Sequence, residues 1–156
     1  MKNLIRLIDV TNQEMAKSLL EVQLPAYKVE AELIGFDGIP ALKDTVETLS
    51  NCGETFYGYF IDEELAGAIS YKEDEEMVDI HRLIVHPDHF RKGIGKELVS
   101  YILDIVACGR KVIVSTGAQN YPAMQLYRSL GFEEKKDVEV GPGIFVTLLE
   151  RVYPLK

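Results

Sequence analysis

Residues 91–96 combine three cationic side chains with two glycines, a composition suited to binding an anion. They follow an apolar strand that ends at Leu83, Ile84 and Val85, and they open a helix. A helix N-terminus presents unpaired backbone N–H groups and the positive end of the helix dipole, and glycine lets a phosphate reach those groups closely. The stretch therefore predicts an anion cradle, best suited to a pyrophosphate. Its members are Arg91, Lys92, Gly93, Ile94, Gly95 and Lys96.

Two other glycine-rich phosphate loops do not fit these residues. The pattern GxxxxGK[ST] fails because Glu97 follows Lys96. The pattern GxGxxG fails because no third glycine follows Gly93 and Gly95 at the required spacing. A glycine-rich helix entry with no ligand is the remaining alternative.

The bulk composition limits the classes of protein and partner. The chain has 156 residues, which suits one domain spanning residues 1–156. Its net charge of −8 argues against nucleic acid as a partner, because nucleic acid is bound by clustered positive charge. The same charge is compatible with a cationic substrate such as an amine, but the simpler interpretation, that it keeps the protein soluble, is better supported.

The sequence carries no pattern typical of a metal site, a leader peptide or a membrane span. Cys52 and Cys108 are isolated and have no metal-like spacing to a histidine. Arg6 and Asp9 interrupt the apolar segment that a signal peptide needs. No apolar run approaches the roughly 18 residues of a transmembrane helix. We therefore expect a cytoplasmic protein with no metal and no membrane partner.

Hydrophobic periodicity and turn residues predict seven strands and four helices. The predicted strands are residues 3–10, 54–61, 65–72, 77–85, 111–115, 133–140 and 144–152. The predicted helices are residues 12–22, residues 40–51, a segment from the cradle to Gly109, and residues 120–131. Thr11 and Glu14 form a predicted capping box for the first helix, and Pro25 lies beyond its predicted end. Residues 27–36 fit either a short helix or a loop.

The order of these elements predicts the fold class. Residues 77–85 and 111–115 are joined through a helix, which implies a parallel strand pair with a right-handed crossover. Residues 111–115 form a continuous β-branched run, as expected for a strand buried on both faces. We predict a mixed α/β (α+β) fold, with a sheet of about seven strands flanked by about four helices. The parallel pair would lie beside the cradle.

Two spaced motifs give the chain a family resemblance. The first is VHPDHFRKGIG, residues 85–95, and the second is N-x-x-A-x-x-x-Y-x-x-x-G-F, residues 120–132. Gly95 and Asn120 are 25 residues apart, and a predicted strand lies between them. In motif, order and spacing the chain resembles the GNAT acetyltransferase superfamily over most of its length.

One part of the first motif departs from the family's usual pattern. Phe90 stands where Arg or Gln is usual in the cofactor loop, and Arg91 stands where Gly is common. Arg91, Lys92 or Lys96 could supply the displaced charge. Backbone N–H groups would still form the cradle.

The resemblance implies a cosubstrate and a reaction. Acetyl-CoA would place its pyrophosphate in the cradle and pair its pantetheine arm with the backbone of Leu83, Ile84 and Val85, like an added strand. Backbone N–H groups of the same segment would stabilise charge on the thioester oxygen. The acetyl group would pass directly to a primary amine in a ternary complex, without a metal.

The resemblance also assigns a general acid. It places Tyr127 near the thioester sulfur, where a positioned proton donor is typically worth roughly 10²–10⁴ in rate. Asn120 lies seven residues earlier on the same helix face and would bind the pantetheine arm or act through a water. The alternatives are a core aromatic for Tyr127 and a plain helix N-cap for Asn120.

The general base has two candidates on the strand at residues 77–85. Asp79 and His81 are two residues apart, which predicts that they share one strand face with Leu83 and Val85. Asp79 falls where some members of the family carry a catalytic Glu, and His81 belongs to the residue type most often used as a base near neutral pH. Structural roles for both, with an ordered water carrying the proton, are the alternative.

Residues 27–36 would cover the acceptor site in a protein of this family. Glu30, Glu32 and Asp37 could attract a cationic amine, or they could form a solvated acidic surface. We expect a small-molecule or peptide amine as the acceptor, and the last hairpin could mediate a homodimer. A second class of function is a CoA-binding regulatory or scaffold module that has lost the chemistry, which the ambiguous base and Phe90 motivate.

Overall fold

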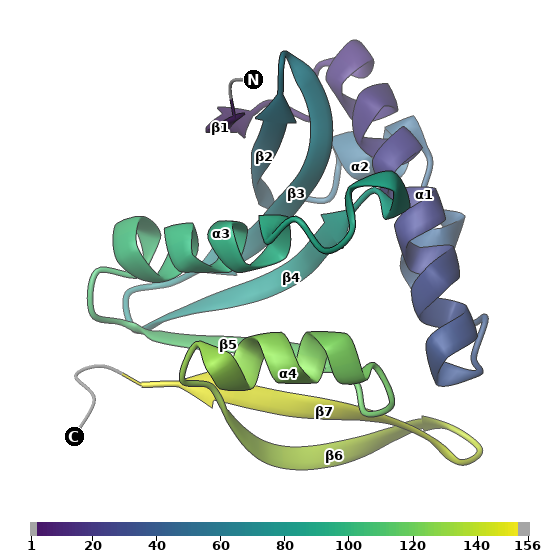
Figure 1. Cartoon of the computed structure of the whole chain (residues 1–156), viewed down its shortest axis with the longest axis vertical. Helices are drawn as coiled ribbons and strands as arrows, with labels where there is room; N and C mark the ends of the chain where they lie inside the picture. Colours follow the sequence, from purple (N-terminus) through teal and green to yellow (C-terminus); the bar gives the residue numbers. More distant parts are fainter. Residues whose placement is uncertain (1–2, 153–156) are drawn as a thin grey trace.

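The seven strands form one mixed sheet in the computed structural model, which describes residues 3–152 (Figure 1). The strand order is β1-β2-β3-β4-β5-β7-β6, and within these residues β4 and β5 are the one parallel pair. The strands are β1 Asn3–Ile8, β2 Thr55–Ile61, β3 Glu64–Glu73, β4 Met77–Val85, β5 Lys111–Gly117, β6 Glu133–Gly141 and β7 Ile144–Arg151. The predicted mixed fold with its parallel pair is confirmed.

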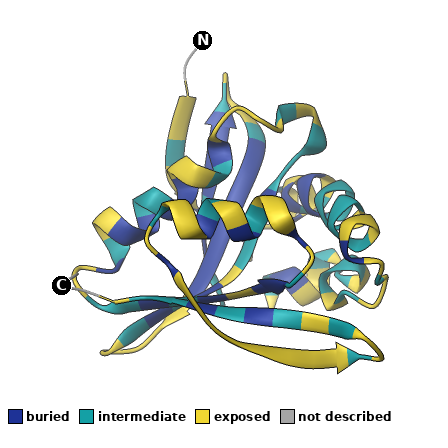
Figure 2. Ribbon diagram, turned by 60° about the horizontal axis from the view of Figure 1, so that its bottom comes forward, coloured by how far each residue is buried: buried dark blue, intermediate teal, exposed yellow. Residues whose placement is uncertain are grey.

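Helices cover both faces of the sheet and create two separate cores (Figures 1 and 2). They are α1 Gln13–Ile34, η1 Pro40–Lys43, α2 Val46–Ser50, η2 Pro87–His89, α3 Ile94–Tyr101, η3 Ile102–Val106 and α4 Tyr121–Ser129. On one face, Leu98 of α3 and Met124 of α4 pack in a core with Ile80 of β4. On the other face, Leu19 of α1 packs in a core with Ile84 of β4. Full burial of such a side chain contributes roughly 1.5–3 kcal/mol.

Helix α1 extends much further than the sequence predicts. The prediction ended this helix at Val22, before Pro25, but α1 continues through Pro25 to a left-handed C-cap at Gly35 (φ 67°). A proline inside a helix costs roughly 3 kcal/mol. Leu19 and Val22 are buried, and α1 packs against β3 and β4. Tertiary packing therefore overrides the local stop signal.

The caps of the early helices also differ from the predicted ones. Asn12, rather than Thr11, caps α1, because its side chain accepts a hydrogen bond from the first helical turn. Thr11 donates instead to the Asp9 carboxylate. The single helix predicted over residues 40–51 is divided into η1 and α2, because Thr45 caps α2 through a reciprocal pair of hydrogen bonds.

Strands β4 and β5 pair at one end and diverge at the other (Figure 1). Their parallel register begins at Met77 and Lys111 and stops at Ile80 and Val114, although both strands continue beyond these residues. The second half of β4 therefore has β3 on one side and no paired strand on the other. This divergence creates the space in which the candidate site lies.

A bulge at His81 changes which β4 side chains share a face. The pairing of β3 with β4 slips by one residue there. An extra residue in one strand reverses the alternation of side chains beyond it. Leu83 and Val85 consequently pack against the same core as Ile80, and Asp79 points to the opposite face. The predicted common face of Asp79, Leu83 and Val85 is wrong for this reason.

Strand β6 is an exposed edge of the sheet. Every residue from 133 to 140 is exposed (Figure 2). A homodimer through the β6–β7 hairpin stays a prediction. Among the helices of residues 3–152, none has both the length and the apolar character that crossing a bilayer requires.

Candidate active site

Two cavities share a wall beside the divergence of β4 and β5. The first, which we call the acidic cavity, has a volume of about 370 Å³, and its lining includes Tyr27, Asp44, Glu54, His81, Arg82 and Tyr127. The second, which we call the cradle cavity, has a volume of about 560 Å³, and its lining includes Val85, Arg91, Gly93, Gly95, Lys96 and Leu126. Four residues line both cavities: Glu30, Leu83, Asn120 and Ala123.

The cradle is a turn with left-handed residues that leads into α3. Arg91 has φ 66° and Gly93 has φ 78°, and Gly93 is the N-cap of the helix. The backbone N–H groups of the first turn, at Ile94, Gly95 and Lys96, have no acceptor within the helix. They lie at the positive end of its dipole, so the predicted anion cradle has the geometry that such a site requires.

Most of the predicted cradle residues line the cradle cavity. These are Arg91, Gly93, Ile94, Gly95 and Lys96. Lys92 lies outside it, with its Nζ atom 2.9 Å from Nδ1 of His89. Phe90 lines the cavity and is 43% exposed. Of the three predicted cations, Arg91 and Lys96 therefore line the cradle cavity and Lys92 does not.

Strand β4 presents backbone groups of two residues toward the diverging β5. The His86 N–H group donates a hydrogen bond of 2.9 Å to the Ala66 carbonyl of β3. Successive residues of an antiparallel strand face opposite neighbours, so Leu83 and Val85 face away from β3. Neither is paired with β5. Ile84 faces β3 instead, and its side chain is buried in the core beneath α1.

An ion-pair network lines the acidic cavity. Arg82 bonds Glu54 twice, from Nε to Oε1 at 2.9 Å and from Nη2 to Oε2 at 3.3 Å. Its Nη1 bonds Asp44 at 2.5 Å and Gln23 at 3.0 Å. Ser70 donates a further bond of 2.6 Å to Glu54. The Arg82, Asp44 and Glu54 side chains are at most 14% exposed, so the guanidinium is largely occupied by these partners.

The network keeps both of its carboxyl groups ionised. Burial acts to raise the pKa of Asp44, but hydrogen bonds from Thr48, Arg82 and Gln23 outweigh it and lower this pKa. Burial likewise opposes the hydrogen bonds from Arg82 and Ser70 that lower the pKa of Glu54. Two carboxylates facing one guanidinium leave the network with one uncompensated negative charge.

Tyr127 is both a core residue and part of the acidic cavity wall. Its side chain is 3% exposed, and its ring meets that of Phe132 edge to face at a centroid distance of 5.3 Å. Burial, assisted by the nearby Tyr27 and Glu30, raises the pKa of Tyr127. The hydroxyl therefore carries a proton at neutral pH, and the raised pKa makes it a weaker acid than an exposed tyrosine.

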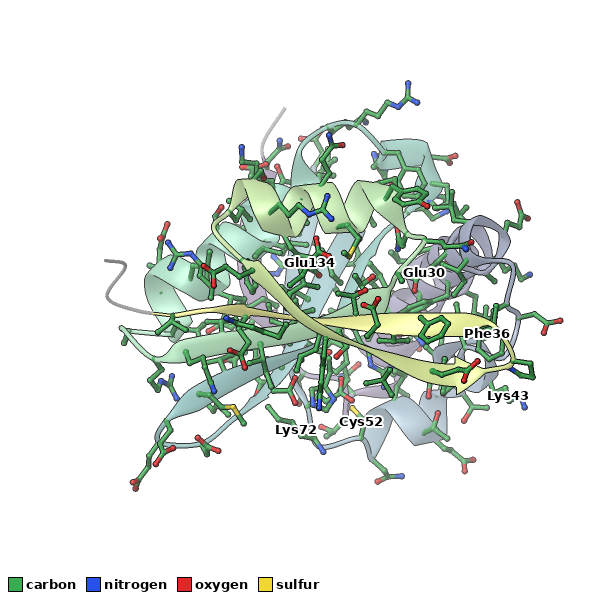
Figure 3. All side chains as sticks on the ribbon, turned by 90° about the horizontal axis from the view of Figure 1, so that it is seen from below. Glu30, Phe36, Lys43, Cys52, Lys72 and Glu134 are labelled. Atoms are coloured by element: carbon green, nitrogen blue, oxygen red, sulfur yellow. The ribbon has the colours of Figure 1, made fainter. Side chains whose placement is uncertain are left out.

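Asn120 joins α4 to α1 at the shared wall. Its Oδ1 atom accepts a hydrogen bond of 3.3 Å from the Ala123 N–H group, which makes it the N-cap of α4. Its side chain also hydrogen-bonds Glu30 of α1, which is labelled in Figure 3. Burial raises the pKa of Glu30, and the bond to Asn120 opposes this shift only in part.

The two predicted bases occupy different positions. His81 lines the acidic cavity, with Nε2 3.4 Å from Oδ2 of Asp79 and Nδ1 3.7 Å from Oε2 of Glu54. Asp79 lines neither cavity, and its side chain is 43% exposed. Glu32 and Asp37 are exposed and also lie outside both cavities.

Comparison with known proteins assigns the family. The sequence profile described as the acetyltransferase (GNAT) family matches residues 17–132. The chain belongs to the GNAT acetyltransferase family. The matched span includes the cradle, α4 and all four residues of the shared wall.

Solved structures share the fold of this GNAT chain. The PaiA N-acetyltransferase of Thermoplasma acidophilum, in complex with coenzyme A, superposes with a TM-score of 0.78 at 22% identity over 98% of this chain and 100% of that one. The ribosomal-protein-S18-alanine N-acetyltransferase of Escherichia coli gives a TM-score of 0.78 at 16% identity over 99% and 96%. At such identities the likeness is one of fold.

Sequence relatives of the GNAT chain are longer than it is. The UPF0157 protein YqkA of Bacillus subtilis (strain 168) is 41% identical over 140 residues, which cover 90% of this chain and 40% of that protein. The L-amino acid N-acyltransferase MnaT of Escherichia coli (strain K12) is 43% identical over 54 residues, which cover 33% and 31%. The matches therefore span less than half the length of these relatives.

The ion-pair network of this GNAT chain was not foreseen from the sequence. Arg82 is separated from Glu54 by 28 residues and from Asp44 by 38 residues, so no local pattern joins them. One signal was available, because Arg82 is a charge within the strand segment at residues 77–85. A charged side chain in a buried strand is rarely left unpaired.

Proposed function

We propose that this protein is an acetyl-CoA-dependent N-acetyltransferase that moves an acetyl group to a primary amine by direct attack. The observation that carries the proposal is the wall common to the two cavities. A cosubstrate in the cradle cavity and an acceptor in the acidic cavity would meet at this wall. Direct transfer needs the reacting atoms within about 3–3.5 Å, which adjoining cavities allow without a covalent enzyme intermediate.

The cradle cavity suits coenzyme A at both ends of the molecule. The pyrophosphate would bind the first-turn N–H groups of α3, assisted by Arg91 and Lys96. The pantetheine arm would pair with the free edge of β4 at Leu83 and Val85, and an N–H group of this edge would stabilise charge on the thioester oxygen. Acetyl-CoA supplies the acetyl group in activated form. The PaiA complex with coenzyme A supports this choice of cosubstrate.

Tyr127 is the proposed general acid. Tyr127 lines the acidic cavity, and its hydroxyl carries a proton at the pH of the reaction. The departing thiolate of coenzyme A is stabilised by receiving a proton. Asn120 would hold the neighbouring backbone and side chains in place while this proton moves.

The charge of the acidic cavity favours a cationic acceptor without a carboxylate beside its amine. Asp44 and Glu54 are ionised, and Glu30 adds a third carboxyl group to the lining. Arg82 is the permanent cation of the lining, and its guanidinium is already bonded to two carboxylates. A substrate carboxylate would therefore enter a negative site without a free cationic partner, which costs free energy.

The test is an acceptor screen that follows the release of free thiol from acetyl-CoA. We expect turnover with one or more alkyl amines, diamines or polyamines, and binding of coenzyme A by calorimetry in the absence of an acceptor. Binding without turnover of any amine or peptide would favour the regulatory-module alternative. Failure to bind coenzyme A would show that the cradle holds a different anion or none.

A further inference from the structure

The shared wall contains a single titratable side chain. Of the four residues that line both cavities, Leu83 and Ala123 are apolar and Asn120 carries a neutral amide. The fourth is Glu30, on α1. We propose that Glu30 is the general base that takes the proton from the acceptor's ammonium group, an inference that rests on the proposed acetyl transfer.

Glu30 and Asn120 lie together on the shared wall. The Asn120 amide oxygen is engaged by the Ala123 N–H group at the start of α4, which fixes the orientation of the amide. The Asn120 side chain interacts with the Glu30 carboxyl group, and both residues line the junction of the two cavities. A general base must lie within hydrogen-bond reach of the proton that it removes. An acceptor nitrogen placed to attack at this junction would satisfy that condition.

The surroundings of Glu30 make it a stronger base than an exposed carboxylate. Burial is the largest influence on its pKa and raises it. The facing groups are Tyr27 on α1 and Tyr127 on α4. Asp44, Glu54, His81 and Arg82 line the acidic cavity, and His89, Arg91 and Lys96 line the cradle cavity. A catalytic base is most effective when its pKa lies near the working pH.

The two candidates on β4 fit the role less well. Asp79 lines neither cavity, and it lies on the strand face opposite to Leu83 and Val85. His81 lines the acidic cavity alone and has no place on the shared wall. Of the three acid–base candidates Asp79, His81 and Glu30, only Glu30 lines both cavities and so lies where the cosubstrate would meet the acceptor.

The proton and bond changes balance without a further reactant. Glu30 takes one proton from the acceptor ammonium, and the freed lone pair of nitrogen forms the C–N bond to the acetyl carbon. The C–S bond then breaks, and the thiolate takes the proton of the Tyr127 hydroxyl. The second proton on the acceptor nitrogen passes to Tyr127 and restores its hydroxyl. The products are the acetylated amine and free thiol, and Glu30 returns its proton to solvent.

The experiment compares two isosteric substitutions on α1 with the best amine from the acceptor screen. Glu30→Gln removes the proposed base, whereas Glu21→Gln makes the same change two and a half helical turns earlier, at an exposed position on the opposite side of the helix. We expect Glu30→Gln to lower kcat by about 10²- to 10⁴-fold. Coenzyme A binding, measured by calorimetry, and thermal unfolding should report a folded protein in both variants.

The pH profile separates a base from a binding group. In the wild type, kcat/KM should rise with pH through the pKa of Glu30, which lies above the ordinary carboxyl value of 4.5. This acid limb should be lost in Glu30→Gln, kept in Glu21→Gln, and kept at a reduced rate in Glu30→Asp. The Asp variant retains a carboxyl group, so it also tests the inference if the Gln variant folds poorly.

Several outcomes would overturn the inference. If Glu30→Gln raises KM and leaves kcat and the acid limb intact, Glu30 only attracts the acceptor. If the acid limb disappears in His81→Gln and persists in Glu30→Gln, the base is His81. Both results leave the proposed acetyl transfer in place. A wild-type protein that turns over no amine would instead overturn the acetyl transfer, together with any base assigned to it.

Discussion

Arg82 and Glu54 are joined by two parallel hydrogen bonds, of 2.9 Å and 3.3 Å, between side chains that are 13% and 7% exposed. Such a bidentate pair fixes both groups in one orientation. It also ties the bulged segment of β4 to the residue that precedes β2. The lining of the acidic cavity is therefore held by charge as well as by packing.

Removal of Arg82 should destabilise the fold strongly. Arg82→Met leaves the carboxylates of Asp44 and Glu54 buried without their cation, and breaking a buried pair in this way costs about 3–5 kcal/mol. Urea unfolding would measure the loss. The matched control is Arg128→Met, because Arg128 pairs with Glu134 at the surface, where about 0–1 kcal/mol is expected. Equal losses in the two variants would contradict a structural role for the network.

The contribution of the ion-pair network to the free energy of unfolding should decrease at acidic pH. Asp44 and Glu54 have folded-state pKa values below their ordinary 3.8 and 4.5, so the stability they provide is complete above those ordinary values. It is lost as the pH falls through the lowered folded-state values. Unfolding free energies of wild type and Arg82→Met, measured from pH 7 to pH 2, should therefore converge at the acid end. If the unfolding free energies of the two proteins differ by the same amount at every pH, charge is not the cause of the stabilisation.

Tyr127→Phe should remove catalysis and keep the fold. The Phe ring retains the buried edge-to-face contact with Phe132 but has no proton to give. We expect kcat to fall at least ~10-fold, within a range that extends to ~10⁴, with little change in coenzyme A affinity. Tyr121→Phe on the same helix is the control, because Tyr121 is 70% exposed. Full activity in Tyr127→Phe would exclude Tyr127 as the general acid.

Gly95→Ala should separate cofactor binding from stability. A Cβ atom at Gly95 would lie 3.7 Å from Leu83 and 3.9 Å from Leu126, which is ordinary van der Waals contact. Alanine is the better helix former by up to about 1 kcal/mol, so the melting temperature should stay level or rise. Because the methyl group enters the cradle cavity beside the first-turn N–H groups, the Kd for coenzyme A should increase. Unchanged affinity would place the ligand elsewhere.

Acceptor preference should follow charge. Lysine differs from cadaverine by one carboxylate, so the two form a matched pair for kinetic comparison. We expect kcat/KM for cadaverine to exceed that for lysine by more than about 10-fold, equivalent to 1.4 kcal/mol. The reason is that Asp44 and Glu54 already occupy the Arg82 guanidinium. Equal rates would show that the acceptor's carboxylate lies outside the acidic cavity.

Local signals in the sequence were sufficient for most elements of the fold and for the turn that leads into α3. Strand alternation and the turn before Gly93 depend on residues that are close together in the sequence, so a short segment is enough to predict them. The first helix was predicted too short because the local effect of Pro25 is outweighed by the packing of α1 on β3 and β4. That packing joins residues that are far apart in the sequence. The strand face of Asp79 was predicted wrongly for a related reason. The bulge at His81 is a shift in the pairing of two strands, and the sequence of one strand does not reveal it.

The chemistry of the candidate site was predicted less completely than its location. Asn120 and Tyr127 were recognised through a motif on one helix, and both line the acidic cavity. Glu30 was one of two acidic residues in the ambiguous segment at residues 27–36. Its special position depends on α1 meeting α4, which the sequence places far apart. Glu30 is distinguished from Glu32 by its long-range contacts rather than by its residue type.

The free edge of β4 allows hydrogen exchange to report whether a ligand is bound along this strand. The amide hydrogens of Leu83 and Val85 face a gap in the middle of the sheet, whereas that of Ile84 faces β3. Deuterium should therefore replace the first two readily and the third slowly. A ligand lying along β4 would slow the exchange at Leu83 and Val85 and leave Ile84 as an internal reference, so three consecutive amides would record whether the groove is filled.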